Sequence, residues 1–379
     1  MAHQFGQNRQ LDAQWLALTE RVSTAGARWL DSLFSAFPSP TALLESAGSR
    51  DGQDVVAALR RELELSAPIT LPSALRRGAP LWLVTTQHAE YPPLLAECED
   101  RPPFLFVRGR LESLLEQSLS VVGTRKPSLG GRRATADLVT AAVVGDRSIV
   151  SGLALGIDGI AHDVAVRSGG TSIAVLPCGI DRTYPQRHAA LAEQLTRRGA
   201  IVSEFPLGTP PRKHHFHRRN RTLSGFSVAT LVVEAGRPSG TLLTASAAAD
   251  QGRDVLTLPW SIYHSGAAGC RYLLSDGAVL IQSAEDLLSH LGVTRDTVTA
   301  EPPPDEPLFT QQAEGPSLAS SATEPDQQAL LTLLGAETHT VEACAIALGW
   351  QMERCLSGLV ALEVAGKVAR ASHGYCALP

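Results

Sequence analysis

Between residues 119 and 258 the chain alternates short apolar segments with longer helical patterns. The apolar segments are rich in β-branched residues and span 119–122, 148–150, 171–176, 200–203, 228–233 and 255–258. Helical periodicity fills most of the intervals, at 131–144, 157–168, 188–198 and 241–252. Strands that are apolar on both faces and joined by crossover helices form a parallel sheet with helices on each side. The alternation therefore predicts a doubly wound α/β sheet, and two further apolar stretches, 81–84 and 104–107, predict strands that precede it.

The sequence on either side of this region predicts a further domain and a linker. Residues 1–70 show helix-like spacing of apolar residues, which favours a small helical domain of the sterile-alpha-motif or helix-hairpin-helix kind or a structural appendage. Residues 71–292 then form the main α/β domain. Residues 293–325 are rich in proline and poor in large apolar residues, which predicts a linker.

Residues 326–379 predict three helices and a β-hairpin, the arrangement of a winged helix. Duplex binding by such a domain needs several cations to neutralise phosphates. Its acidic residues outnumber its basic ones, which favours protein contact or a structural role over DNA binding. The acids are Asp326, Glu337, Glu342, Glu353 and Glu363, and the bases are Arg354, Lys367 and Arg370.

Composition limits the class of protein and its partners. The formal net charge is −5, so any nucleic-acid site must be a local basic patch on an acidic body. A membrane span is not expected, since no apolar run reaches about 18 residues, and the polar N-terminus precedes no signal-like apolar region. The six cysteines are scattered without a CxxC pair, which is typical of reduced thiols in the cytoplasm.

Small and polar residues follow the predicted strands. In parallel sheets, ligands bind outside the carboxyl ends of the strands, so these residues define a candidate site. They are Gly123, Thr124 and Arg125, then Ser151 and Gly152, then Ser239, Gly240 and Thr241. Such loops expose backbone N–H groups to anions. The sequence contains neither a GxGxxG fingerprint at the first turn nor a GxxxxGK[ST] loop, so no nucleotide cofactor is predicted.

A basic and aromatic segment, residues 210–225, follows the fourth strand of this region. Its candidate DNA-binding residues are Lys213, Phe216, Arg219, Asn220 and Arg221. This combination suits a single strand of nucleic acid, because the cations can hold phosphates and the aromatic ring can stack on bases. A run of arginines can alternatively form a solvated helix face. His214, His215 and His217 lack the partners of a metal site, so no metal is predicted, and their protonation could make DNA affinity depend on pH.

Several long motifs resemble the DNA-processing protein A family (DprA, also called Smf). They are VVGTRKP, SGLALGIDGIAH, LPCGIDRTYPQRH, SEFPLGTPPRKHHF with the following RRNR, and SGTLLTASAAADQGRDVLTLPWSI. The resemblance is strongest over residues 80–290 and continues into both ends of the chain. It implies an extended Rossmann-like fold flanked by a small helical domain and a winged helix.

The resemblance also implies roles for individual residues. Arg125 and Lys213 match contacts to the DNA backbone, and Phe216 matches a ring that stacks on a base. Asn220 and Arg221 match the polar end of the same pocket, which the loops at 151–152 and 239–241 line. Two positions depart from the usual pattern, because Leu155 replaces a basic residue and His217 replaces a proline.

The function implied by the resemblance is not enzymatic. Members bind single-stranded DNA without strong sequence preference and load the RecA recombinase onto it during natural transformation (competence) and homologous recombination. They act as homodimers without a nucleotide, and single-strand-binding protein is a further candidate partner. Two alternatives stay open. One is a Rossmann-like phosphoribohydrolase using Glu204 or Glu234, although its PGGxGTxxE run is absent, and the other is a recombinase-binding scaffold.

Overall fold

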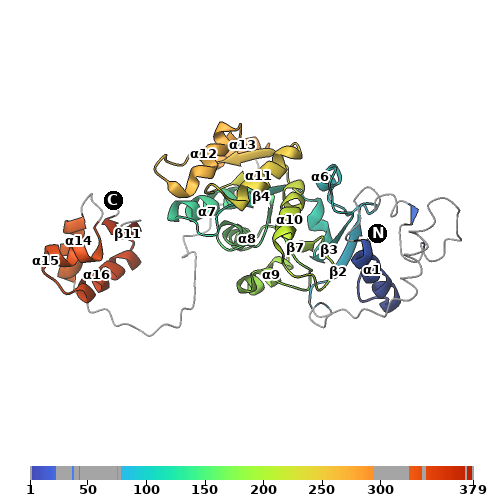
Figure 1. The fold of residues 1–379 in the computed structure, drawn as a ribbon, viewed down its shortest axis with the longest axis horizontal. Coiled ribbons are helices and arrows are strands. Elements are labelled where there is room, and N and C mark those ends of the chain that lie inside the picture. Colours follow the sequence, from blue (N-terminus) through green and yellow to red (C-terminus); the bar gives the residue numbers. More distant parts are fainter. Residues whose placement is uncertain are drawn as a thin grey trace. The chain divides into compact units, whose positions relative to one another are not determined.

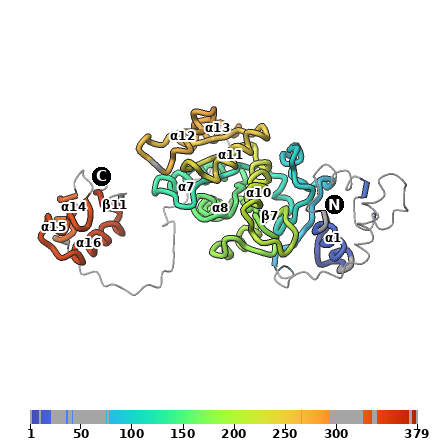
Figure 2. Tube along the Cα trace, in the orientation of Figure 1, coloured from blue at the N-terminus to red at the C-terminus, as the bar shows by residue number. Residues whose placement is uncertain are grey.

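The chain forms two compact units, Met1–Pro304 and Asp305–Pro379. The computed structural model describes residues 2–22, 78–293, 324–334, 339–371 and 374–377, together with the single residues 36, 37, 42 and 75 (Figures 1 and 2). Most of the predicted N-terminal helical domain lies outside the described residues, as does most of the predicted linker. Both of those boundaries stay predictions.

A ten-stranded sheet forms the centre of the first unit, counted over the residues that the structure describes. Its spatial order is β1-β2-β3-β7-β6-β5-β4-β8-β9-β10. The strands are β1 (His3–Gln4), β2 (Leu81–Thr85), β3 (Phe104–Gly109), β4 (Ser118–Val122), β5 (Ser148–Ser151), β6 (Ser172–Val175), β7 (Ala200–Ser203), β8 (Ala229–Val232), β9 (Asp254–Thr257) and β10 (Val279–Leu280). The predicted strands are therefore confirmed to within about two residues at each end.

Seven of these strands, from β7 to β10 in spatial order, run parallel, whereas β1, β2 and β3 are added antiparallel beyond β7. The chain enters the parallel part at β4, moves outward through β5 and β6 to β7, and then returns to β8 on the other side of β4. The switch point of the sheet therefore lies between β4 and β8. A crevice at such a point is the usual ligand site of doubly wound folds.

Helices cover both faces of the sheet, as the doubly wound prediction requires. On one face, side chains of β4 and β8 share a core with α7, α8 and α13. On the other face, they share a core with α6, α10, α11 and α12. The helices are α6 (Pro93–Ala96), α7 (Leu129–Val144), α8 (Ile157–Arg167), α9 (Ala189–Leu195), α10 (Lys213–Gly225), α11 (Gly240–Asp250), α12 (Ala268–Ser275) and α13 (Ala284–His290), with 3-10 turns η1 (Leu111–Leu115), η2 (Gln186–His188) and η3 (Ser265–Ala267). The predicted α/β fold is confirmed.

The strand β4 shows how the sequence produces these layers. Leu119 and Val121 enter the core shared with α7 and α8, while Val122 enters the core shared with α10 and α11. Ser120 also lies on this second side, where its hydroxyl donates to the carbonyl of Leu223 in α10. Alternate side chains of a strand point to opposite faces, so a strand covered on both faces is apolar on both.

The N-terminal residues belong to the same sheet. β1 pairs antiparallel with β2, and α1 (Arg9–Val22) follows it. Trp15, Leu16 and Leu18 of α1 are buried in the core that also contains Phe106 of β3. The helical periodicity read in this stretch is therefore confirmed for α1, and its apolar face is covered by the sheet unit.

The second unit contains three helices and a hairpin. They are α14 (Glu324–Leu334), α15 (Val341–Leu348), α16 (Met352–Val364), β11 (Val368–Ala371) and β12 (Gly374–Ala377). Their shared core includes Leu330, Cys344, Cys355, Leu359 and Tyr375. The order of elements is that of a winged helix, as the sequence predicted. Among the described residues of either unit, no helix is both long and apolar enough to cross a bilayer.

Candidate nucleic-acid interface

The loops after β4 and β8 are joined at the switch point of the sheet. The backbone N–H of Thr124 donates to the carbonyl of Glu234 at 2.7 Å, and the Thr241 hydroxyl donates to the carbonyl of Gly123 at 3.1 Å. These contacts join the loop that carries Arg125 to the N-terminus of α11. The Arg125 side chain remains exposed above this junction.

The loop after β5 packs directly against the backbone of the same junction. Gly156 has a φ of +84°, a conformation that side chains disfavour, and precedes α8. A Cβ at Gly156 would collide with the Thr124 carbonyl oxygen and with the backbone of Arg125. The N–H of Ile157 donates to the same carbonyl of Thr124. The backbone position of Arg125 is therefore fixed from two sides.

Phe216 is the centre of a cluster of cations and aromatic rings. The guanidinium carbons of Arg125 and Arg219 each lie 5.9 Å from the centre of its ring, within cation–π range. The ring of Tyr184 meets Phe216 edge to face, with centroids 5.8 Å apart. Lys213 lies one helical turn before Phe216 at the exposed start of α10. We call Arg125, Tyr184, Lys213 and Phe216 the switch-point site.

The crossing path of α10 explains how Phe216 reaches this place. β7 lies beyond β6, so the chain must cross the face of the sheet from the carboxyl end of β7 to the amino end of β8 beside β4. Helix α10 makes this crossing, and its Arg219 donates to the carbonyl of Val175 at the end of β6. Phe216, one turn earlier, is thereby held above the strand ends and next to the loop of Arg125.

Arg219, Ser151 and Gly152 lie beneath the switch-point site rather than on its surface. Arg219 is buried and faces Asp158, and a Cβ at Gly152 would collide with its guanidinium. Asp158 accepts hydrogen bonds from the N–H groups of Gly152 and Ala154. Burial raises the pKa of Asp158, and the positive charge of Arg219 opposes this shift. These residues support the site from below.

The basic residues in the later part of α10 are engaged in ion pairs. Arg218 donates to the buried carboxylate of Glu204 at 2.7 Å. Arg221 pairs with Asp100 and, at 3.3 Å, with Asp250, two turns away from Lys213 along the helix. Asn220, between them, is half-buried. The structure therefore brings Arg125, Lys213, Phe216 and Arg219 together and places Arg221 outside this group.

The loop at 239–241 begins α11 beside the same junction. The Ser239 hydroxyl accepts a hydrogen bond from the N–H of Thr241 and caps the helix. Gly240 is exposed, and a Cβ there would meet no atom within 4 Å. This helix N-terminus adjoins Gly123, where a partial positive charge favours anions.

Tyr184 is the member of the switch-point site that sequence reasoning did not select. It lies in the segment between β6 and α9 and is 38% exposed. Tyr184 belongs to the motif LPCGIDRTYPQRH, but a tyrosine next to a proline does not by itself indicate a functional role. Only the fold shows that this segment reaches Phe216 of α10.

The two carboxylates considered for hydrolysis have structural partners. Glu234 is 2% exposed and accepts hydrogen bonds from the N–H and hydroxyl of Ser128 at the start of α7, and its other oxygen lies 3.1 Å from His264. Glu204 accepts from Arg218 and from the Thr222 hydroxyl. Burial raises the pKa of Glu204, and Arg218 opposes this shift.

The histidines of α10 show no arrangement for metal binding. His215 is buried, its ring packs on Phe205 with centroids 4.4 Å apart, and its Nδ1 lies 3.0 Å from the Pro210 carbonyl oxygen. Burial lowers the pKa of His215, so this ring stays neutral at pH 7. In the parts of the chain that the structure describes, no three His, Cys, Asp or Glu residues form a metal-ligand group.

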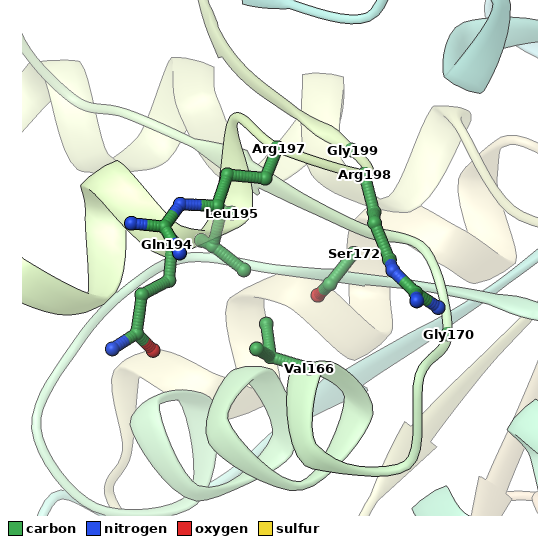
Figure 3. Close-up of a pocket in the computed structure, with 8 residues that line it drawn as sticks. All are labelled: Val166, Gly170, Ser172, Gln194, Leu195, Arg197, Arg198 and Gly199. Atoms are coloured by element: carbon green, nitrogen blue, oxygen red, sulfur yellow. The ribbon is translucent and has the colours of Figure 1, made fainter.

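A separate pocket of about 350 Å³ lies at the amino ends of β6 and β7 (Figure 3). Ser172, the first residue of β6, and Gly199, which precedes β7, line it together with Val166, Leu195 and Arg197. The neighbouring Arg198 donates to the carbonyl of Gly169. Because this pocket adjoins the amino ends of the strands, it is distinct from the switch-point site.

Together, the sheet and its appended unit define an extended Rossmann-like protein with a C-terminal winged helix. The chain matches the family model of DNA recombination-mediator protein A over residues 82–292, and a DprA winged-helix model over residues 313–374. It therefore belongs to the DNA recombination-mediator protein A (DprA/Smf) family, as the motifs indicated.

Individual relatives agree with this assignment. The chain is 38% identical to protein Smf of Escherichia coli over 304 residues, which cover 78% of this chain and 77% of that protein. A crystal structure of DprA from Streptococcus pneumoniae matches with a TM-score of 0.57 at 28% identity, covering 74% of this chain and 95% of that one. A structure of DprA from Helicobacter pylori, described for its single-stranded DNA binding mode, matches with a TM-score of 0.50 at 25% identity and covers 55% of this chain and 95% of that one.

Proposed function

We propose that this protein binds single-stranded DNA at the switch-point site without strong sequence preference. The observation that carries the proposal is the meeting of Arg125, from the loop after β4, with Phe216, from the helix that crosses the sheet. A cation beside a half-exposed aromatic ring can hold a phosphate while the ring stacks on the adjacent base. A duplex hides its base faces, so a single strand is the better ligand.

Charge and dipole support the same ligand. Lys213 and Arg125 are exposed, whereas Arg218 and Arg221 are engaged with carboxylates. The N-termini of α10 and α11 begin near the same strand ends and add partial positive charge. A compact cationic site of this kind can bind a phosphate backbone on a protein whose net charge is −5.

We further propose that the bound strand is handed to the RecA recombinase during natural transformation and homologous recombination. The family description as a recombination mediator and the strand-binding Helicobacter relative support this role. The protein would act in the cytoplasm as a homodimer, without enzymatic activity and without a nucleotide. Single-strand-binding protein is a further expected partner. RecA ATP hydrolysis on DNA coated with that protein tests the transfer step.

The binding proposal is tested by fluorescence anisotropy with a labelled oligothymidylate and a duplex of equal length over a salt series. We expect tight binding of the single strand, weak binding of the duplex and a steep salt dependence. Arg133→Ala is a matched control for substitutions of Arg125, since Arg133 is exposed on α7 and 3.9 Å from Asp137. Absence of single-strand binding at low salt would refute the proposal.

The phosphoribohydrolase alternative is not favoured by the described geometry. Glu204 and Glu234 are both nearly inaccessible and hold structural hydrogen bonds, so neither is placed to contact a ribose above the site. Incubation with a panel of nucleoside monophosphates tests the alternative directly. Release of free base that depends on either carboxylate would revive it.

A further inference from the structure

Helix α16 of the winged-helix unit has an exposed apolar ridge in addition to its buried face. Its inner face is formed by buried residues including Cys355, Leu359 and Leu362. The outer face carries Met352, Leu356, Val360 and Val364, which are 51%, 45%, 45% and 85% exposed. These four residues recur at every fourth position and so form one continuous row along the helix.

Such a row is complementary to a copy of itself. Ridges formed by residues four apart pack into the matching grooves of a second helix at a crossing angle of about −50°, the commonest geometry of helix pairs. When both helices carry the same ridge, one two-fold axis relates the two surfaces, as in an isologous dimer. Figure 1 shows α16 in this unit beside α14 and α15.

The charges beside the ridge favour an antiparallel pair. Glu353 is exposed in the first turn of α16, and Lys367 is exposed just beyond its last turn. A two-fold axis across the middle of the helix brings Glu353 of one copy toward Lys367 of the other. It also sets the two helix dipoles in opposite directions, which is favourable.

The same face is unsuited to a phosphate backbone. The helix that a winged helix inserts into DNA normally carries polar and basic side chains toward the bases and phosphates. Here the outward row is aliphatic, and Glu353 and Glu363 are exposed beside it. The single arginine of the helix, Arg354, is paired with Asp326 at 2.6 Å and packs on the ring of Trp350.

We propose that the winged-helix unit is a self-association module. In this module α16 of one chain crosses α16 of a second chain through the row Met352, Leu356, Val360 and Val364. Four side chains per copy form a small contact compared with the ~800 Å² per partner of a standard interface, so the pairing is weak and concentration-dependent. This inference does not depend on the DNA-binding proposal.

Cysteine cross-linking of the full chain tests the pairing. In Val360→Cys, the new thiol lies near the two-fold axis, where the copy's thiol can reach it. Thr332→Cys is the control, since Thr332 is exposed on α14, away from the ridge, and is nearly isosteric with valine. Of the native cysteines, five are buried and Cys376 is half-buried, so the wild-type chain gives the background rate.

Under mild oxidation we expect Val360→Cys to form an intermolecular disulfide at least tenfold faster than Thr332→Cys. Adding Leu356→Glu should reduce the rate to that of the control, and thermal melting of each variant verifies folding. Equal rates for the two cysteine variants, or a rate unaffected by Leu356→Glu, would overturn the proposal. Loss of the cross-link on addition of duplex DNA would also overturn it, because nucleic acid would then be the occupant of the ridge.

Discussion

The guanidinium of Arg125 lies 5.9 Å from the centre of the Phe216 ring, although the two residues come from different elements of the chain. Arg125 lies in the loop between β4 and α7, and Phe216 lies in the first turn of α10. The pair combines one group suited to phosphate with one suited to a base face. The two functions can be separated experimentally, because only the first depends on charge.

Arg125→Ala is expected to weaken single-stranded DNA binding and also to change its salt dependence. Each phosphate contact contributes about 0.7 to the slope of log K against log salt for single strands, so the slope should fall by about that amount. Anisotropy titrations at four salt concentrations measure both quantities. Arg133→Ala should leave the slope unchanged, and an unchanged slope in Arg125→Ala would remove Arg125 from the site.

Phe216→Ala is expected to weaken binding without changing the salt slope. Loss of base stacking costs about 1–3 kcal/mol per base, while no charge is removed. Tyr263→Ala is the matched control, because Tyr263 is an aromatic residue 90% exposed in another loop. If both variants bind like the wild type, Phe216 is a packing residue and the stacking role fails.

Gly152→Ala is expected to destabilise the sheet unit by about 1–3 kcal/mol, the usual cost of overpacking. The added methyl group would collide with the Arg219 guanidinium and approach the Asp158 carboxylate. Urea unfolding followed by tryptophan fluorescence measures the loss. Gly240→Ala is the control, because a Cβ there meets nothing within 4 Å and should cost no stability. Equal stability of the two variants would contradict the tight packing beneath the switch-point site.

His162 is expected to make folding stability depend on pH. Burial, and secondarily the nearby His188, lowers the pKa of His162 to about 3 from an ordinary value of 6.5. The unfolded chain therefore binds a proton below pH 6.5 that the folded chain excludes. As pH falls from 6.5 toward 3, His162 therefore lowers the free energy of unfolding by about 1.4 kcal/mol per pH unit. At pH 5 the loss amounts to about 2 kcal/mol.

Comparison with His162→Gln isolates this contribution. The stability of the wild type relative to the variant should fall by about 2 kcal/mol between pH 7 and pH 5 in urea titrations. His217→Gln, at an exposed position of α10, is the control for replacing a histidine outside the core. A constant difference between wild type and His162→Gln would mean that His162 accepts a proton in the folded protein.

Much of the fold could be predicted because burial on both faces leaves a strong signal. β4 and β8 are apolar on both sides, so their runs stand out from the helical segments between them. The strand β1 gave no such signal, since it is only two residues long and both, His3 and Gln4, are polar.

The site was harder to predict than the fold. Arg125 was selected because it follows a strand and Phe216 because it lies among cations, and the fold brings the two together. Sequence could not distinguish Arg219, which is buried, from Arg221, which pairs with Asp250, because both lie in one basic run. Charge along a chain does not show which carboxylate a side chain will meet after folding.

The pairing of β1 with β2 has a practical consequence for anyone who shortens this protein. Removing the first residues would uncover the outer edge of β2 and leave its backbone N–H and C=O groups without partners. Bare sheet edges recruit strands from other molecules and lead to aggregation. Removal that extends through Phe5 would also uncover Phe106, because the two rings stack with centroids 6.1 Å apart. If a shortened protein precipitates, the expected cause is therefore the exposed edge of the sheet and not the loss of a separate domain.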